Sequence, residues 1–223
     1  DKNTGTSKTV TLTSSYSGAD VSNYTITDQA SATANISAKA LGLSIPGASR
    51  MYDGTTSISP SGPVTLLGVI GTDQLTLGNG TVTGYVDKNV GTNKTVTYTG
   101  LVLTGVDSGN YTLPAQPTSD ATITAAPLTI SGITAANKTY DSTTSATVNA
   151  LQVVKTGLIG NDVVNVAATG IFANKTVANG KTVTLSSSYS GADLGNYNIS
   201  DQASSTADIS AKAITISGIT ASN

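Results

Sequence analysis

The chain has 223 residues, a formal net charge of −2, and neither cysteine nor histidine. It therefore lacks the thiolate and imidazole groups that serve as nucleophiles, general bases and ligands in zinc, haem and iron–sulfur sites, and we expect neither an enzyme nor a resident cofactor. A slightly acidic chain without clustered Lys or Arg is also not expected to bind nucleic acid, and no apolar run approaches the roughly 20 residues that a membrane-spanning helix requires.

Short strands with a two-residue period follow one another along the chain. Val10 and Leu12 alternate with threonines, and Leu41, Leu43 and Ile45 alternate with small or polar residues. The same alternation returns further on, at Leu128 and Ile130, at Val183 and Leu185, and at Ile214 and Ile216. Apolar residues that alternate with Thr between Gly, Asn and Asp turns indicate half-buried strands. No stretch carries the apolar stripe of an amphipathic helix.

Four sequence blocks recur in the same order at intervals of 86 to 88 residues. The first is Lys-Thr-Val-Thr (from Lys8, Lys94 and Lys181), and the second is Asp-x-x-Asn-Tyr (ending at Tyr24, Tyr111 and Tyr197). The third is Ile-Ser/Thr-Ala (from Ile36, Ile123 and Ile209), and the fourth is Tyr-Asp-x-Thr-Thr (from Tyr52 and Tyr140). A fixed period of this length indicates tandem structural repeats. We expect complete repeats at 37–123 and 124–209, the C-terminal half of a truncated repeat at 1–36, and the first strand of a following repeat at 210–223, so that the chain is a window onto a longer array.

The spacing within a repeat predicts a β-sandwich, because about seven short strands fall in each period. Two of the Asp-x-x-Asn-Tyr blocks read Asp-x-Gly-Asn-Tyr, from Asp107 and from Asp193, which is the spacing of the corner before strand F of immunoglobulin-like sandwiches. In that corner the Tyr hydroxyl bonds to backbone a few residues upstream. We expect Tyr24, Tyr111 and Tyr197 to act in this way, although Ser22 stands at the Gly position of the first copy.

The Tyr52-Asp53-Gly54-Thr55-Thr56 and Tyr140-Asp141-Ser142-Thr143-Thr144 blocks, each followed by Asp-x-Gly-Asn-Tyr, resemble the YDG and MBG (mostly bacterial immunoglobulin-like) repeats. Such repeats occur in large bacterial surface adhesins, often of filamentous-haemagglutinin type. The resemblance implies an all-β chain of tandem immunoglobulin-like β-sandwich repeats that form an elongated rod. It implies an extracellular location at the bacterial cell surface, and it implies nothing about an active site.

The Tyr-Asp blocks have two interpretations. As a structural element, Asp53 and Asp141 form a turn after the first strand, and Tyr52 and Tyr140 anchor that turn against the sandwich or the preceding repeat. As a binding element, the tyrosines stack on sugar rings and the aspartates accept hydroxyls. We favour the structural interpretation, because identical recognition sites on every spacer repeat would be unusual.

Calcium is the one metal that the composition leaves open, since Asp is a hard oxygen ligand. Several aspartates, including Asp73, Asp107, Asp162 and Asp193, stand in turn-like contexts, but Asp is also an ordinary turn former. A calcium ion that stiffens the array would be expected at the repeat junctions, near Asp120 or Asp208.

These observations predict a structural spacer, or stalk, of a large bacterial extracellular adhesin that projects a binding region for cell adhesion or biofilm formation. Its partners would be adjacent repeats of the same chain, with glycans bound only by regions outside this window, and the chain would be a monomer. The alternative is an array of carbohydrate-binding modules with exposed tyrosines. An enzyme that acts on polysaccharides is a third reading, and it would need two facing carboxylates.

Overall fold

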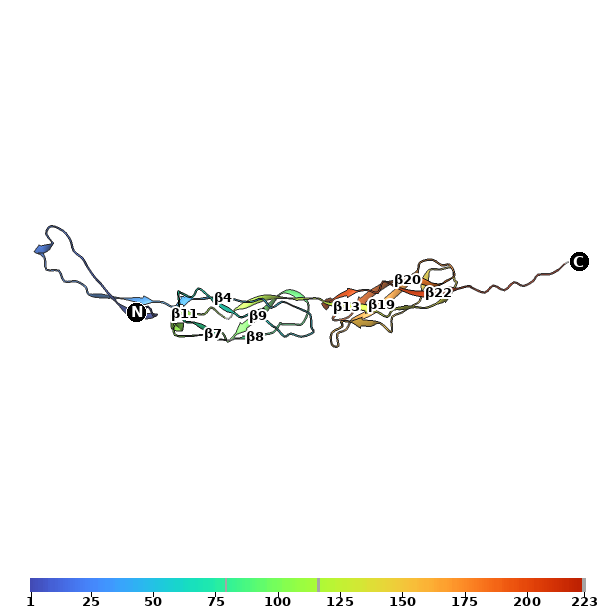
Figure 1. Cartoon of the computed structure of the whole chain (residues 1–223), viewed down its shortest axis with the longest axis horizontal. Coiled ribbons are helices and arrows are strands. Elements are labelled where there is room, and N and C mark those ends of the chain that lie inside the picture. Colours follow the sequence, from blue (N-terminus) through green and yellow to red (C-terminus); the bar gives the residue numbers. More distant parts are fainter. Residues whose placement is uncertain (79, 116, 222–223) are drawn as a thin grey trace. The chain divides into compact units, whose positions relative to one another are not determined.

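The computed structural model describes residues 1–78, 80–115 and 117–221. These residues form strands and three short 3-10 turns: η1 (Val21–Asn23), η2 (Ser108–Asn110) and η3 (Leu194–Asn196). Within the described ranges, no helix has the length and apolar character needed to cross a membrane. The all-β class and the tandem β repeats predicted from the sequence are confirmed (Figure 1).

The chain divides into two compact units, each assembled from separate stretches of sequence. Unit 1 contains Asp1–Ala48, Ser57–Tyr85 and Thr95–Ala121, and unit 2 contains Ser49–Thr56, Val86–Lys94 and Thr122–Asn223. Two segments of the first complete sequence repeat, 49–56 and 86–94, therefore belong to the unit that contains the second repeat. The sequence repeats and the compact units are different divisions of the chain.

The strands of unit 1 pair mostly two by two. The antiparallel pairs are β1 (Gly5–Thr11) with β2 (Ser31–Ile36), β4 (Gly42–Ser44) with β6 (Thr65–Leu67), β7 (Thr76–Gly78) with β10 (Val102–Thr104), and β8 (Thr81–Val82) with β9 (Gly91–Thr99). One pair is parallel, β3 (Lys39–Ala40) with β11 (Tyr111–Thr112). The core of this unit contains Leu41, Val96 and Tyr98, all under 5% exposed.

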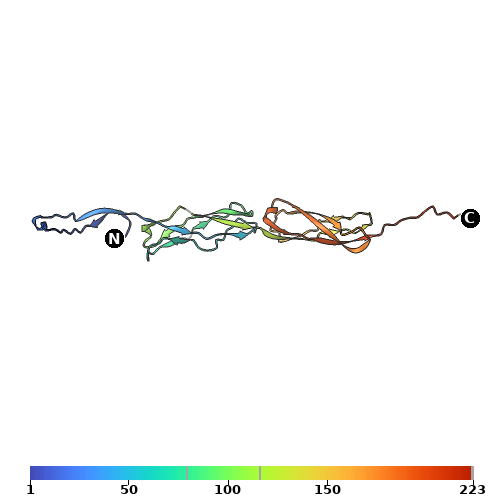
Figure 2. The same cartoon turned by 90° about the horizontal axis from the view of Figure 1, so that it is seen from above.

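Unit 2 contains two larger sheets. The five-stranded sheet has the order β15-β22-β20-β19-β16, with β15 (Lys138–Thr139), β22 (Ser204–Ser210), β20 (Ala178–Ser190), β19 (Asn165–Phe172) and β16 (Ser145–Ala146). The three-stranded sheet has the order β18 (Val154–Thr156), β13 (Ala126–Ser131), β21 (Tyr197–Ser200). A short pair, β14 (Thr134–Ala135) with β17 (Val148–Asn149), completes the unit. Strand β5 (Arg50–Met51) pairs in parallel with the end of β12 (Thr118–Thr124), and both belong to a four-stranded sheet of order β5-β12-β9-β8. Strands β19, β20 and β22 run side by side in Figures 1 and 2.

Alternate side chains of these strands form the core of unit 2. On β13, Leu128 and Ile130 are at most 1% exposed, and on the five-stranded sheet Phe172, Val183 and Ile209 are equally buried. Each sheet thus has one buried face, as in a β-sandwich. Thr fills the outward positions because it keeps β-propensity while it contacts water.

The segment after β22 is not a strand in the structure. Ile214 and Ile216, which alternate in sequence as Leu128 and Ile130 do, are 86% and 77% exposed. The corresponding strand β13 lies between β18 and β21, whereas no strand pairs with 211–221 in the part of the chain that the structure describes.

Two glycines of unit 2 provide a test of the packing. A Cβ on Gly170 in β19 would lie 2.6 Å from Val148 Cγ2 and 2.8 Å from Val183 Cγ1, whereas a Cβ on Gly195 would meet nothing within 4 Å. We predict that Gly170→Ala lowers the free energy of unfolding by about 1–3 kcal/mol through overpacking. Gly195→Ala should change it by less than about 0.5 kcal/mol. Urea denaturation followed by circular dichroism measures both, and equal effects of the two variants would contradict the assigned core.

Candidate functional site

The Tyr-Asp blocks form the same turn in both repeats. Asp53 Oδ1 accepts hydrogen bonds from Thr55 N (2.8 Å) and Thr55 Oγ1 (2.9 Å), and it pairs with Arg50. The residue after each Asp is left-handed, with φ of +78° at Gly54 and +65° at Ser142. The second copy repeats the pattern with Asp141, Thr143 and Lys138, whose bonds lower the pKa of Asp141 to about 2. The aspartate of the motif therefore closes a side-chain-to-backbone turn.

The Tyr52 side chain emerges from this turn and is buried, at 2% exposure. Its hydroxyl donates to Asp162 Oδ2 at 2.7 Å, and its ring packs edge-on against Tyr197 with centroids 5.6 Å apart. Its backbone N–H donates to Thr124 O at 2.8 Å. We expected Tyr52 to pack on its own sandwich or the preceding repeat. That expectation is wrong, because Asp162 and Tyr197 belong to the following repeat and not to the preceding one.

A single lysine connects two aspartates beside Tyr52. Lys88 Nζ lies 2.8 Å from Asp162 Oδ1 and 2.9 Å from Asp193 Oδ1. It also lies 5.7 Å from the centroid of the Tyr52 ring, within range of a cation–π contact. These groups and Tyr197 are called here the junction cluster. All of its members belong to unit 2.

Asn196 extends the junction cluster through its side-chain amide. Its Oδ1 accepts from Val90 N at 2.9 Å, and its Nδ2 donates to Asn89 Oδ1 at 3.2 Å. At 3% exposure it is the one fully buried polar residue in the described ranges. A buried amide whose donor and acceptor are both satisfied holds its neighbours in one arrangement.

The charges of the junction cluster are stabilised by contacts within the cluster. Burial alone would raise the pKa of Asp162, but the bonds from Lys88, Tyr197 and Tyr52 hold it below its usual range. The Val163 N–H and Lys88 lower the pKa of Asp193 in the same way, and bonds to Asp162, Tyr52 and Asp193 raise the pKa of Lys88. Burial and Asp162 raise the pKa of Tyr197 to about 12. At neutral pH the cluster thus holds two carboxylates, one ammonium and two neutral phenols.

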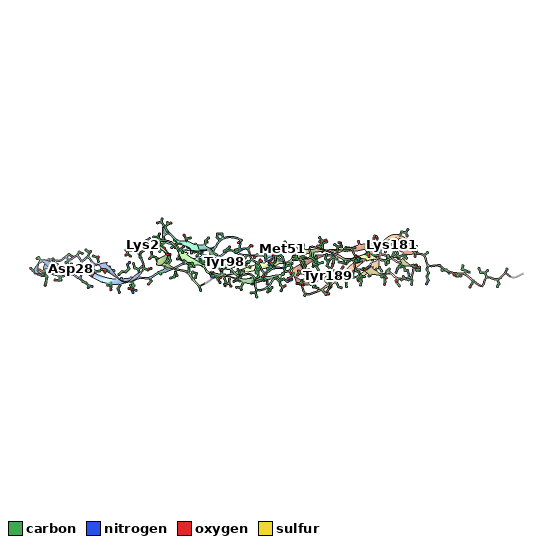
Figure 3. The ribbon with its side chains drawn as sticks, turned by 90° about the horizontal axis from the view of Figure 1, so that it is seen from below. Lys2, Asp28, Met51, Tyr98, Lys181 and Tyr189 are labelled. Atoms are coloured by element: carbon green, nitrogen blue, oxygen red, sulfur yellow. The ribbon has the colours of Figure 1, made fainter. Side chains whose placement is uncertain are left out.

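Unit 1 contains the same arrangement around Lys2, which is labelled in Figure 3. Lys2 Nζ lies 2.6 Å from Asp73 Oδ1 and 3.0 Å from Asp107 Oδ1. Asn110 Oδ1 accepts from Thr4 N at 2.8 Å, as Asn196 does from Val90. The N-terminus and β11, which begins at Tyr111, lie close together in Figure 1. Among the described residues of unit 1, Asp73 accepts a hydrogen bond from Tyr111, but no second tyrosine bonds to it as Tyr52 bonds to Asp162.

The corner tyrosines bond to different partners from those expected. The Tyr111 hydroxyl accepts from Ile70 N at 3.1 Å and donates to Asp73 Oδ2 at 2.6 Å. The Tyr197 hydroxyl accepts from Ile159 N at 2.9 Å and donates to Asp162 Oδ2 at 2.6 Å. These partners lie 35 to 41 residues upstream, so the expected bond to backbone only a few residues away is wrong. The 3-10 turn before each Tyr directs its side chain at a second turn, with the sequence Ile-Gly-x-Asp.

The remaining residues singled out in the sequence lie elsewhere. Tyr24 is 72% exposed. Asp120 is exposed. Asp208 accepts from Gly180 N at 2.7 Å and bonds to Asn137. The described residues contain no group of three or more acidic side chains arranged to hold a metal ion.

Sequence reasoning missed Lys2, Lys88 and the role of the asparagines. A signal was present, because Asp-Lys-Asn recurs from Asp1 and from Asp87, and Ile-Gly-x-Asp recurs from Ile70 and from Ile159. Four aspartates that we considered in turn-like contexts, Asp73, Asp107, Asp162 and Asp193, are bridged in pairs by lysine, whereas the junction candidates Asp120 and Asp208 are not among them. Each pair already has a cationic partner, supplied by a side chain.

The glycine of the Tyr-Asp-Gly turn provides the first test of the site. The backbone of Gly54 is left-handed, a conformation that residues with a side chain rarely adopt, and a Cβ at this position would lie 3.0 Å from Ile159 Cγ2. We predict that Gly54→Ala lowers the free energy of unfolding by about 1–2 kcal/mol. The reciprocal Ser142→Gly should raise it by less than about 1 kcal/mol, because it relieves the left-handed serine. Thermal unfolding measures both changes, and a neutral Gly54→Ala would count against the turn.

The lowered carboxylate pKa values predict a pH dependence. A carboxylate whose folded pKa lies below its unfolded value stabilises the fold above the unfolded value, about 3.9, and this stabilisation is lost as the pH falls through the folded pKa. We therefore expect constant stability from about pH 5 to 8 and a decline below about pH 4.

The variant Asp162→Asn isolates the contribution of the junction cluster to that profile. It should lower stability at pH 7 by about 1–3 kcal/mol, because Lys88 and two phenols lose a charged acceptor, and it should make the acid decline shallower. Asp201→Asn, at an exposed position, is the matched control. Chemical denaturation at a series of pH values gives both curves, and an unchanged profile for Asp162→Asn would refute the assignment.

Residues 37–119 and 124–207 each match the family model of the YDG domain, and together they cover well over half of the chain. Each matched segment contains one Tyr-Asp turn and one corner tyrosine. No curated protein and no solved structure matches the chain. The chain belongs to the YDG domain family and contains two copies of that domain.

Proposed function

We propose that this chain is a spacer segment of a large bacterial extracellular adhesin, in which tandem YDG domains hold a binding region away from the cell surface. The family membership and the sequence period support a repeat array. The resemblance to repeats of filamentous-haemagglutinin-type adhesins supports the surface location. The partners of each domain are then its neighbours in the same chain.

The observation that carries this proposal is the recurrence of the junction cluster. Lysine, two aspartates, asparagine and tyrosine meet in both units, and the equivalent residues are 86 to 89 positions apart in sequence. In unit 2, Tyr52 and Lys88 come from one repeat, and Asp162 and Asp193 come from the next. Contacts that recur at this period and join consecutive repeats serve to limit bending between them.

The chemistry of the cluster supports a mechanical role over a catalytic one. A glycosidase needs one carboxyl group with a raised pKa that acts as an acid. The pKa values of Asp162 and Asp193 are both lowered, and one lysine forms ion pairs with both carboxylates. The carbohydrate-binding alternative depended on exposed tyrosines at the Tyr-Asp turns. Tyr52 is buried, so its ring is not a platform for a sugar.

Loosening the junction cluster tests the spacer proposal. We expect the double variant Tyr52→Ala/Lys88→Ala to keep its circular dichroism spectrum and to show a broader distribution of interatomic distances in small-angle X-ray scattering. The matched control is Lys175→Ala, since Lys175 stands at the period position of Lys88 but is exposed. Identical scattering from the double variant, the control and the wild type would contradict a role in limiting bending.

The surface location requires a separate experiment. Antibodies raised against the 223-residue chain should label intact cells of the producing bacterium, and external protease should remove the label. Labelling that appears only after cell lysis would refute the location. Specific binding of the isolated chain on a glycan array would favour the carbohydrate-binding alternative.

A further inference from the structure

Strand β20 contains a β-bulge at Asn179 and Gly180. The register of β20 on β22 shifts at this point, and the two residues face the single residue Asp208. Gly180 is left-handed, with φ of +62°. A bulge of this kind leaves its extra residue unpaired and interrupts the ladder locally. The Asn-Gly pair therefore lies outside the regular pairing of the two strands.

Both residues of the bulge contact solvent. Asn179 and Gly180 are exposed, and a Cβ on Gly180 would meet nothing within 4 Å. Within the described ranges, the side-chain amide of Asn179 makes no hydrogen bond. The equivalent residues of the first complete repeat, Thr92 and Asn93, are also exposed, although the second repeat follows them. Solvent access is thus a property of the bulge itself.

The residue opposite the bulge holds its backbone. The Gly180 N–H donates to Asp208 Oδ1 at 2.7 Å. Strands β1 and β2 have the same irregularity, and there the Ser7 N–H donates to Asn35 Oδ1 at 2.8 Å. Either side chain satisfies the bulged N–H, but only the carboxylate can also take its proton. At this distance Asp208 is within reach to act as a general base towards Gly180 N.

The bulge does not require glycine. Ser7 and Asn93 stand at the same period position as Gly180 and take the same left-handed conformation, with φ of +52° and +54°. The Asn-Gly pair is therefore not imposed by the shape of the backbone. What glycine adds is access, because without a side chain its nitrogen reaches the side-chain carbonyl carbon of the preceding asparagine with the least hindrance.

We propose that the Asn179–Gly180 bulge is a site of self-modification, at which Asn179 loses ammonia with Asp208 as the base. Asp208 takes the proton from Gly180 N, this nitrogen bonds to Asn179 Cγ, and the side-chain nitrogen leaves with that proton as ammonia. Water then adds its hydroxyl to one carbonyl of the cyclic imide and its remaining proton to the nitrogen. Breaking the bond from this nitrogen to the backbone carbonyl carbon gives isoaspartate, and breaking its bond to Cγ gives aspartate.

The bulge can accommodate either product. Isoaspartate adds a methylene group to the main chain at a point where the β20–β22 ladder is already interrupted. We therefore expect the pairs on both sides to persist. The lasting change is a new carboxylate in the pocket that Lys138, Asn179 and Asp208 help to line. This modification does not depend on the spacer role.

Peptide mapping of the full chain tests the proposal. After incubation at neutral pH and physiological temperature, the tryptic peptide 176–181 should contain isoaspartate and aspartate in place of Asn179. Conversion should be about tenfold or more faster than in a synthetic peptide of the same residues, because only the folded chain positions a base at Gly180 N. Conversion in the chain that is absent, or no faster than in the synthetic peptide, would overturn the proposal.

The variant Asp208→Asn separates a base from a side chain that only holds the bulge. Asn35 shows that an asparagine opposite the bulge keeps its N–H bonded, so the variant should fold, while conversion falls about tenfold or more. Asp201→Asn, at an exposed position, is the matched control and should convert at the unaltered rate. Unchanged or faster conversion in Asp208→Asn would overturn the role of Asp208.

A second variant keeps the test decisive if Asp208→Asn disturbs folding. Gly180→Ser places in β20 the residue that Ser7 provides in β1, so it should retain the bulge, as judged by circular dichroism, and slow the conversion of Asn179. Conversion at the unaltered rate in Gly180→Ser would count against ring closure by this nitrogen. The sequence has a second Asn-Gly pair at 79–80, of which residue 79 lies outside the described ranges. Its rate, read in the same digests, should be the same in all variants.

Discussion

The shared carboxylate of Asp162 is the contact on which the arrangement of unit 2 depends. One oxygen accepts two phenols and the other meets an ammonium, so one side chain satisfies groups from three separate stretches of sequence. A carboxylate with 6% exposure would be costly without these partners. With them it is ionised and fully bonded, and its partners cannot be moved without leaving a charge unpaired.

Within the junction cluster, the hydrogen-bond donors and the acceptors come mainly from different repeats. One repeat supplies mainly donors: the Tyr52 hydroxyl, the Lys88 ammonium and the Val90 N–H. The next repeat supplies acceptors, Asp162, Asp193 and the Asn196 carbonyl oxygen. Donors therefore meet acceptors only when repeats follow one another in this order. Glu is absent from the chain, and the shorter Asp side chain has fewer rotatable bonds to immobilise in such a position.

The sequence predicted the parts of this structure that arise locally. The alternation at Leu128 and Ile130 indicated buried strand faces, and the recurrence of Tyr-Asp-x-Thr-Thr indicated a repeated turn, because both patterns are read over a few residues. The direction of Tyr52 could not be predicted in this way, since Asp162 lies 110 residues further along the chain. Lys88 was missed for the same reason, its partner being 74 residues distant. Gly195 has open space around it and no positive φ, which explains how Ser22 can stand at the same position of the first copy.

The regular spacing of the cluster residues has a consequence for how such chains evolve. Because the equivalent residues of the two clusters are 86 to 89 positions apart, removing or duplicating one whole period would bring groups of the same kind together again. Unequal crossing-over between repeats would thus change the length of the protein without a penalty in stability. An insertion between the donor and acceptor segments that is not a multiple of the period would displace these groups from one another.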